Sequence, residues 1–222
     1  MKPYYADDAV TLYLGDCREV TKWLEADVLV TDPPYGMAYS GFGGRKGEPR
    51  RTTGPLSITG DVDTASRDEI LTLWGDRPAL VFGTWRIARP AATRQVIVWD
   101  KSANGPGMGA LDVPWGPSHE EVYVLGSGWT GTRGGSVYRD KPFTSGDSSR
   151  PDHPTPKPTS LMERLIAHSV GTIADPFAGS GSTLVAAKRL GRKAIGVEIE
   201  ESYCEVIAKR LSQGVLDFGE PA

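Results

Sequence analysis

Apolar and polar positions along the chain follow two repeats, which predict alternating strands and helices. Short apolar runs rich in β-branched residues are typical of buried strands, and they occur at residues 10–14, 27–31, 79–83, 95–99, 121–125, 172–175 and 193–197. Longer segments with apolar residues three or four positions apart predict amphipathic helices, at residues 17–24, 66–74, 159–169, 182–190 and 201–211.

This alternation predicts the α/β class, with a doubly wound, mostly parallel sheet of seven strands in a Rossmann-like arrangement. A chain of 222 residues is within the size of one domain, so we expect a single domain over residues 1–222. The strands at 95–99 and 121–125 have no predicted helix between them, which indicates an antiparallel, hairpin-like edge.

Four consecutive residues after the strand at 27–31 form a stiff loop, Asp32-Pro33-Pro34-Tyr35. Each proline fixes its own φ and restricts the preceding residue to extended conformations. The Asp32 carboxylate and the Pro33 carbonyl can then accept both N–H groups of a nucleobase amine, while Tyr35 offers a flat face for stacking. Accepting both hydrogens favours a pyramidal, more nucleophilic nitrogen. A proline-rich turn without a function is the alternative.

A strand, a glycine turn and a helix follow one another near the carboxyl end of the sequence. Gly179 and Gly181 separate the strand at 172–175 from the helix at 182–190, where they let the backbone approach a ligand beside the unpaired N–H groups of the helix. Their spacing is that of neither a dinucleotide site nor a P-loop, which favours a nucleoside without phosphates. Glu198 ends the next strand, about where an acidic residue accepts from ribose hydroxyls.

The two motifs resemble those of the amino-group (N6-adenine/N4-cytosine) DNA methyltransferases. Asp32-Pro33-Pro34-Tyr35 is similar to their catalytic motif, and Asp-Pro-Phe-Ala-Gly-Ser-Gly at 175–181 is similar to their S-adenosylmethionine motif. The segments Tyr-Leu-Gly-Asp-Cys at 13–17 and His-Pro-Thr-Pro-Lys-Pro at 153–158 match as well. Because the catalytic motif comes first, the chain resembles the circularly permuted β group. The resemblance implies the S-adenosylmethionine-dependent methyltransferase fold and this cofactor.

The resemblance also implies roles for single residues around the cofactor. Asp16 would accept from its adenine amine, Phe177 would lie near the adenine ring, and Glu198 would bind its ribose. Cys17 would supply a backbone contact, and the segment 153–157 would line the methionine end. The whole implied set is Asp16, Cys17, His153, Thr155, Lys157, Asp175, Phe177, Gly179, Gly181, Ser182, Thr183 and Glu198.

Several members of this set have simpler interpretations. Asp16 could cap the helix predicted at 17–24, since Asp is a preferred N-cap residue. His153 and Lys157 could belong to a proline-rich surface linker. Glu198 could pair with a neighbouring base, Arg192 or Lys193.

Cysteine usage narrows the chemistry further. Methylation of carbon 5 of cytosine needs a thiolate nucleophile. Cys17 directly follows Asp16, and Cys204 lies in a predicted helix far from the loop at 32–35, so neither is a candidate nucleophile. Direct transfer to a base nitrogen needs neither a covalent intermediate nor a metal. Two cysteines without paired spacing, and histidines His119 and His168 without further ligands nearby in the sequence, predict no metal site.

Nucleic acid is the expected partner, although the chain is slightly acidic, with a formal net charge of −3. Any basic surface must therefore be local and its binding sensitive to salt. Glycine-rich segments at 36–60, 101–118 and 126–152 are the candidate contact loops, and a mobile solvated surface is the alternative. The candidate contact residues are Arg45, Lys46, Arg50, Arg51, Arg133 and Arg139.

Together the patterns and the resemblance predict a site-specific DNA methyltransferase that acts on adenine N6. Asp rather than Ser at position 32 favours adenine by resemblance; cytosine N4, RNA and a non-catalytic binding partner with the same fold stay open as alternatives. We expect a short recognition sequence, limited specificity or a homodimer, because no separate target-recognition segment is evident. The first ten residues have no signal-peptide core and no run is long enough for a membrane span, so we expect the cytoplasm of a bacterium or of a phage-infected cell.

Overall fold

A computed structural model of the chain describes residues 1–37, 40–41, 56–57, 61–105, 107, 112–144, 147, 150–151, 153 and 155–213. Most of the loop predicted at 36–60 lies outside these residues. The same holds for four of the predicted nucleic-acid contacts, Arg45, Lys46, Arg50 and Arg51.

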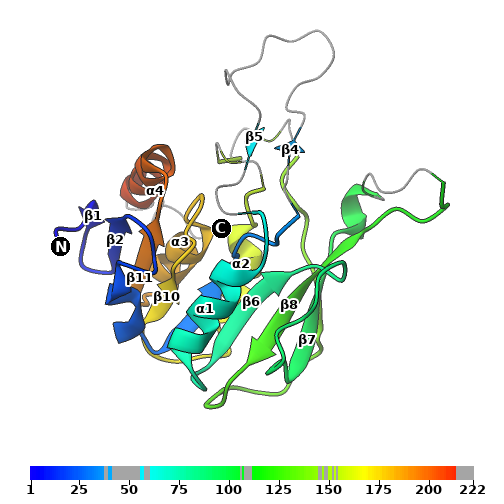
Figure 1. The fold of residues 1–222 in the computed structure, drawn as a ribbon, viewed down its shortest axis with the longest axis horizontal. Coiled ribbons are helices and arrows are strands. Elements are labelled where there is room, and N and C mark those ends of the chain that lie inside the picture. Colours follow the sequence, from blue (N-terminus) through cyan, green and yellow to red (C-terminus); the bar gives the residue numbers. More distant parts are fainter. Residues whose placement is uncertain are drawn as a thin grey trace, which may run out of the picture.

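One mixed sheet runs through the molecule (Figure 1) in the strand order β1-β2-β11-β10-β3-β6-β8-β7-β9. Its strands are β1 Tyr5–Ala6, β2 Val10–Leu14, β3 Val28–Thr31, β6 Ala79–Gly83, β7 Gln95–Asp100, β8 His119–Leu125, β9 Val137–Arg139, β10 Ile173–Asp175 and β11 Ala194–Glu198. A separate antiparallel pair consists of β4 Ser40–Gly41 and β5 Leu56–Ser57.

The helices connect the strands and cover the sheet. They are α1 Ala65–Trp74, α2 Thr159–Ile166, α3 Ser182–Arg189 and α4 Glu201–Gln213, with 3-10 helices η1 Thr21–Glu25 and η2 Ser102–Asn104. No helix in the described parts of the chain is both long and apolar enough to span a membrane.

Strand directions confirm the predicted fold class. β2, β11, β10, β3 and β6 are mutually parallel, whereas β8 is antiparallel to both β6 and β7. All seven predicted strands lie in the sheet, which is extended by β1 at one edge and β9 at the other. β10 leads through α3 to β11, and β3 leads through α1 to β6 on its other side, so the chain diverges between β10 and β3. Open α/β sheets bind ligands at such a divergence, at the carboxyl ends of the strands.

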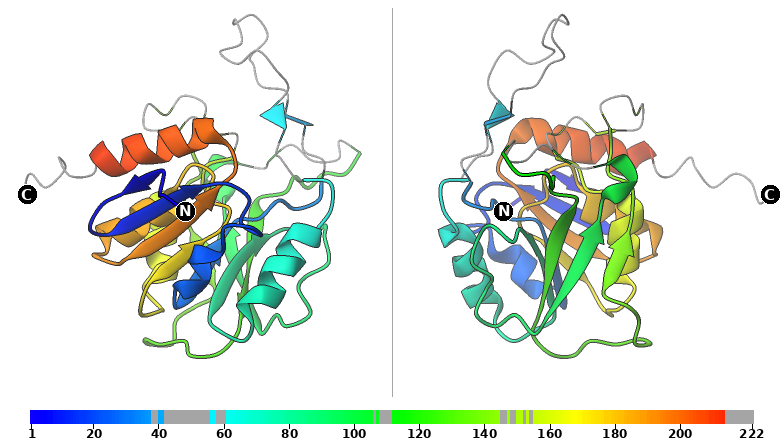
Figure 2. Two further views of the ribbon diagram at one scale, coloured as in Figure 1. Left: turned by 60° about the vertical axis from the view of Figure 1, so that its left-hand side comes forward. Right: turned by 90° about the vertical axis from the view of Figure 1, so that its right-hand side faces the viewer.

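Two apolar layers hold the helices to opposite faces of the sheet (Figure 2). Side chains alternate across each strand, so that Val28 and Val30 of β3 pack with α2, α3 and α4, whereas Leu29 packs with η1 and α1. In the second layer the rings of Trp23 and Trp74 stack with centroids 5.9 Å apart. The loops at the carboxyl ends of β3 and β10 form the cavity described below.

The helix predicted at 17–24 is wrong in type and position. A turn occupies residues 17–19, and the 3-10 helix η1 begins only at Thr21. Val20 has a non-helical backbone, with φ −87° and ψ 85°, and its side chain is buried. The buried indole of Trp23 donates to the Cys17 carbonyl over 2.8 Å, which consumes an acceptor that a regular helix would use. Tertiary packing therefore overrides the local helical pattern.

Two larger differences from the prediction concern α2 and the loop at 126–152. α2 ends at Ile166 instead of residue 169, and the Ser169 hydroxyl donates to the Ile166 carbonyl over 2.8 Å. The loop predicted at 126–152 contains β9, which pairs in parallel with the end of β7.

The turn between β10 and α3 requires glycine at position 181. Its φ of +77° lies in the left-handed region, and a Cβ added there would come 2.9 Å from Cγ1 of Ile207 in α4. Gly191 has a similar φ of +67°, but an added Cβ would meet no atom of the described residues within 4 Å. A side chain at position 191 would therefore add backbone strain alone, whereas one at position 181 would add both backbone strain and a steric overlap.

We predict that Gly191→Ala lowers the free energy of unfolding by about 1 kcal/mol, the cost of a left-handed backbone. Gly181→Ala should lower it by about 2–4 kcal/mol, because steric overlap with Ile207 adds to that cost. Urea unfolding of both variants measures the difference. Equal losses would contradict the packing of α4 on this turn.

Candidate active site

A cavity of about 600 Å³ opens at the carboxyl ends of β3 and β10, where both sequence motifs meet. Its volume is that of an ordinary small-molecule site. The structure brings almost all predicted site residues into its lining: Asp32, Pro33, Pro34, Tyr35, Asp16, Cys17, His153, Thr155, Lys157, Asp175, Phe177, Gly179, Ser182, Thr183 and Glu198. Gly181 is not part of this lining and faces Ile207 instead.

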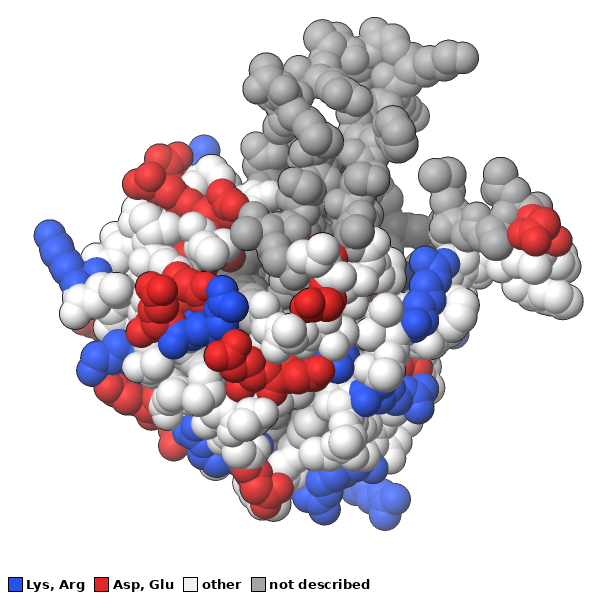
Figure 3. All heavy atoms as spheres, viewed as in Figure 1, with Lys and Arg blue, Asp and Glu red and all other residues white. Residues whose placement is uncertain are grey.

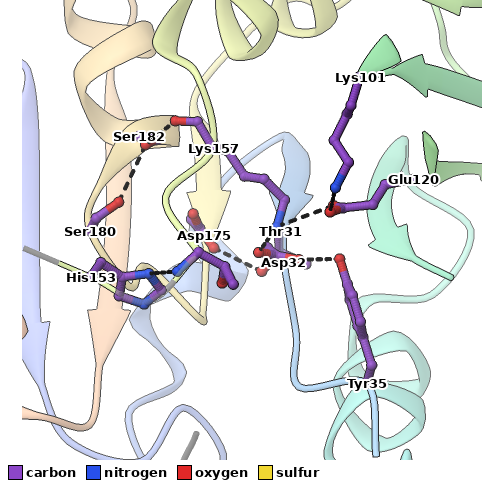
Figure 4. A network of polar contacts seen from close by, with 11 residues as sticks. Thr31, Asp32, Tyr35, Lys101, Glu120, His153, Lys157, Asp175, Ser180 and Ser182 are labelled. Atoms are coloured by element: carbon purple, nitrogen blue, oxygen red, sulfur yellow. Dashed lines mark hydrogen bonds and ion pairs between the residues drawn. The ribbon is translucent and has the colours of Figure 1, made fainter. Parts of the chain in front are cut away.

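Two donors hold the Asp32 carboxylate on the catalytic-type loop (Figure 4). The Tyr35 hydroxyl donates to Oδ1 over 2.7 Å, and the Lys157 ammonium donates to Oδ2. Burial, together with the charges of Asp32 and Glu120, raises the pKa of Tyr35 well above its usual value. Its hydroxyl therefore keeps the proton with which it orients Asp32, and its ring borders the cavity.

A second carboxylate lies behind Lys157, and sequence reasoning missed it. Glu120 Oε2 is 3.5 Å from Lys157 Nζ, and Glu120 Oε1 is 2.5 Å from Lys101 Nζ. Burial opposes the charged forms of Lys157 and Glu120. Their ion pairs outweigh it, so the pKa of Lys157 is raised and that of Glu120 is lowered. The available signal was the antiparallel direction of β8, whose first residues lie at the edge where β6 and β7 end.

Asp175 connects the two strands beneath the cavity. The Thr31 hydroxyl at the end of β3 donates to Asp175 Oδ1 over 2.7 Å, and the backbone N–H of Phe177 donates to the same oxygen over 3.2 Å. Burial raises the pKa of Asp175 to about 7, although the hydrogen bonds from Thr183 and Thr31 oppose this shift. The side chain thus fixes the end of β10 against the end of β3.

Glu198 shapes the glycine turn. Its two carboxylate oxygens accept the backbone N–H groups of Gly179 over 2.7 Å and of Glu200 over 2.9 Å. Burial raises the pKa of Glu198 above its usual value. Arg192, the alternative partner, instead donates to the carbonyl of Gly171 over 2.8 Å. Glu198 therefore lines the cavity as a backbone-bound carboxylate.

His153 is packed into the cavity wall instead of lying on a surface linker. Its Nδ1 accepts the backbone N–H of Thr155 over 3.2 Å, and its ring lies 4.7 Å from that of Tyr203. A Cβ at Gly179 would come 3.1 Å from His153 Nε2, so the glycine turn fits directly against the imidazole. Burial, helped by the charge of Lys157, lowers the pKa of His153 to about 4.

Asp16 and Cys17 border the far end of the cavity. Both carboxylate oxygens of Asp16 accept from Arg18, with 2.9 Å between Arg18 Nε and Oδ1, and this hydrogen bonding lowers the pKa of Asp16. A further donor to Asp16 must share an oxygen with Arg18. Burial raises the pKa of the Cys17 thiol to about 12, so at neutral pH the thiol is protonated and unsuited to nucleophilic attack.

The two described arginines among the predicted DNA contacts lie away from this cavity. Arg133 lines a separate hollow of about 300 Å³ beside Trp129 and His168, near the start of β7. Arg139 in β9 pairs with Asp100, with 2.9 Å between Nε and Oδ2. In Figure 3, Lys and Arg side chains predominate on the right, over β7 and β8, whereas Asp and Glu are more numerous on the left. The charge distribution is thus uneven on a chain of small net charge.

The fold and the cavity define an α/β protein in which the loop at residues 32–35 and the glycine turn line one cavity. The family model for DNA methylase matches residues 65–210, which is more than half of the chain. The chain therefore belongs to the DNA methylase family, and the family identified from the sequence motifs is confirmed.

Named relatives agree with this family. A segment of 65 residues is 51% identical to the Type II methyltransferase M2.LlaDCHI of Lactococcus lactis subsp. cremoris, covering 28% of this chain but only 24% of that relative. YubD of Escherichia coli (strain K12), which carries the name of a methylase, is 30% identical over 220 residues, covering 89% of this chain and 88% of YubD.

Solved structures show the same fold. The M1.HpyAVI–SAM complex superposes with a TM-score of 0.62 at 22% identity, covering 90% of this chain and 99% of that one. The cytosine-N4-specific PvuII DNA methyltransferase superposes with a TM-score of 0.64 at 16% identity, covering 94% and 88%.

The burial of His153 has a consequence for its titration. We predict that the imidazole resonances of His153 stay constant between about pH 5 and 8, where an ordinary histidine titrates, because its pKa is lowered to about 4. Protonation then favours the unfolded state, and this residue's contribution to stability is lost as the pH falls below the ordinary histidine value. NMR titration, with His153→Asn to assign the signals, measures the midpoint. A midpoint near the ordinary histidine value would contradict the packing against Tyr203.

Proposed function

We propose that the protein is a site-specific DNA methyltransferase that transfers a methyl group from S-adenosylmethionine to the N6 amine of adenine. One observation carries the proposal. Asp32 is oriented by Lys157 and Tyr35 in the same cavity that the glycine turn borders. The family supports methylation of DNA, whereas the adenine target rests on the resemblance of the Asp32 loop.

The chemistry of the cavity lining fits S-adenosylmethionine. Carboxylates of Asp16 and Glu198 suit the amine and hydroxyl groups of an adenosine, and Phe177 provides an apolar surface for its ring. M1.HpyAVI, a protein of this fold, has been solved as a complex with the same ligand, SAM. When bound, S-adenosylmethionine supplies an electrophilic methyl group on a sulfonium and leaves as S-adenosylhomocysteine.

The residues of the catalytic-type loop hold the target amine. The Asp32 carboxylate accepts one N–H of the amine and the Pro33 carbonyl accepts the other, which concentrates the lone pair on nitrogen. These interactions strengthen as positive charge develops on that nitrogen, so they favour the transition state. Tyr35 provides the surface on which the flipped base lies, while its hydroxyl keeps Asp32 in place.

Cytosine N4 is the second candidate target because the same two acceptors could hold its amine. The fold does not separate the two bases, since a cytosine-N4-specific enzyme superposes over most of the chain. DNA is the proposed partner in either case. The side of the molecule over β7 and β8, where basic side chains predominate in Figure 3, is the proposed contact surface.

The acceptor base can be read directly from the product. We predict that incubation with labelled S-adenosylmethionine and DNA of mixed sequence, followed by digestion to nucleosides, places the label in N6-methyldeoxyadenosine. Chromatography against both methylated standards measures this outcome. Label found only in N4-methyldeoxycytidine would overturn the adenine assignment while keeping the amine chemistry.

The role of the loop carboxylate is tested by Asp32→Ala. We predict a fall in kcat of about 100-fold or more, the scale seen when a preorganised polar group is removed from an active site. Affinity for S-adenosylmethionine, measured by calorimetry, should stay unchanged. Asp8→Ala, at an exposed bend between β1 and β2, is the matched control and should turn over as the wild type does. Normal turnover by Asp32→Ala would refute this account of the loop.

A further inference from the structure

Four charged side chains form a continuous chain at one side of the cavity (Figure 4). They alternate in sign in the order Lys101, Glu120, Lys157 and Asp32. The contacts are 2.5 Å between Lys101 and Glu120, 3.5 Å between Glu120 and Lys157, and a direct hydrogen bond from Lys157 to Asp32. Three of the four residues line the cavity, and Lys101 anchors the chain from the end of β7.

This arrangement is costly for stability alone. The Lys157 side chain is only 8% exposed, and burying ions is unfavourable unless they are well paired. Replacing a buried ion pair by apolar residues of similar size often leaves the stability of a protein unchanged or increases it. In addition, Glu120 Oε2 is buried and makes no hydrogen bond with any described residue. The chain of charges therefore calls for a role beyond packing.

We propose that Lys157 is a positioning residue that compensates the charge of the Asp32 carboxylate and directs it at the target amine, and that Glu120 holds Lys157 in place. The proposal rests on the proposed function and deepens it. Lys157 lies between two carboxylates and separates their charges, and Glu120 in turn offsets the charge of Lys157. The Asp32 carboxylate therefore does not face a second carboxylate directly.

Removing Lys157 has a specific electrostatic consequence. Asp32 and Glu120, whose side chains are 25% and 21% exposed, would then lie near each other without Lys157 between them, and two like charges in such a site favour uptake of a proton by one of them. Lys101 stays paired with Glu120 Oε1 over 2.5 Å and forms no ion pair with Asp32 among the described residues, and the other groups around Asp32 do not replace the lost cation. Tyr35 donates from a neutral hydroxyl, and the nearby Asp175 raises the density of acidic groups. His153, which also faces Lys157, is uncharged at neutral pH because of its lowered pKa.

The proposal predicts a rescue that a structural role would not produce. Lys157→Met should move the acid limb of the pH profile of kcat upward by about one to three pH units, the effect of losing a close opposite charge. Glu120→Gln should leave the limb in place or move it downward. In the double variant Lys157→Met/Glu120→Gln, Asp32 no longer faces a second carboxylate. The limb should return toward the wild-type position, and kcat at neutral pH should exceed that of Lys157→Met.

The experiment measures kcat at saturating DNA and S-adenosylmethionine over the accessible pH range for the wild type, both single variants and the double variant. The KM values should change little, because Lys101, Glu120 and Lys157 act on the Asp32 carboxylate. The matched control applies the same changes to an exposed ion pair, Lys22→Met and Glu25→Gln, whose Nζ and Oε1 lie 2.6 Å apart in η1. These control variants should keep the wild-type profile.

A second readout does not depend on turnover. In protein labelled at aspartate carboxyl carbons, the NMR midpoint for protonation of Asp32 should rise in Lys157→Met and fall back in the double variant. If Lys157→Met does not fold, Glu120→Gln decides alone, because a rise of the midpoint in that variant would overturn the proposal. The proposal would also be overturned if the double variant matched Lys157→Met both in its kcat profile and in its NMR midpoint. A wild type that methylates no base would sink the proposed function, while the NMR midpoints would still decide this inference.

Discussion

The parallel pairing of β3 with β10 is the constraint on which the site depends. Val28 lies opposite Ile173 and Leu29 opposite Ala174, so the two strands end at the same edge of the sheet. Their last residues are joined by the hydrogen bond from Thr31 to Asp175, across 144 positions of sequence. Both side chains are buried, where a hydrogen bond is costly to leave unmade. The acceptor loop and the glycine turn therefore emerge side by side, and the cavity between them follows from this register.

The two halves of the cavity are then fixed by different forces. Close packing sets the glycine turn, with Gly179 against His153 and Gly181 against Ile207, while Glu198 binds the backbone of the turn. Ion pairs set the acceptor side, where Asp32 lies at the end of a chain of alternating charges. Packing positions a rigid backbone well, whereas an ionised acceptor also needs its charge compensated. Packing thus fixes the backbone of the glycine turn, and ion pairs compensate the charge of Asp32, as the proposed chemistry requires.

Local sequence patterns predicted much of this architecture, because the strands and the two loops depend mainly on residues that are close together in the sequence. Apolar runs located the strands, and the prolines and glycines marked both loops at the correct strand ends. The 3-10 helix at Thr21–Glu25 was missed because Trp23 packs on Trp74, which is distant in sequence. Glu120 was missed for a similar reason. Its place follows from the register of β8 on β7, with Trp99 opposite Glu120, which no local pattern contains.

Lys157, which the resemblance placed at the methionine end of the cofactor, contacts both halves of the site. Its backbone carbonyl accepts the Ser182 hydroxyl of α3 over 2.7 Å, while its ammonium reaches Asp32 on the other side. The hydrogen bond between Thr31 and Asp175 alone would leave Asp32 free to rotate about its own side-chain bonds. Lys157 and Tyr35 together remove that freedom, and Lys157 also links Asp32 to α3, the helix that follows the glycine turn. The proposed methyl transfer requires the amine and the methyl donor to meet in a narrow range of geometries, and this alignment would supply the preorganisation on which electrostatic catalysis depends.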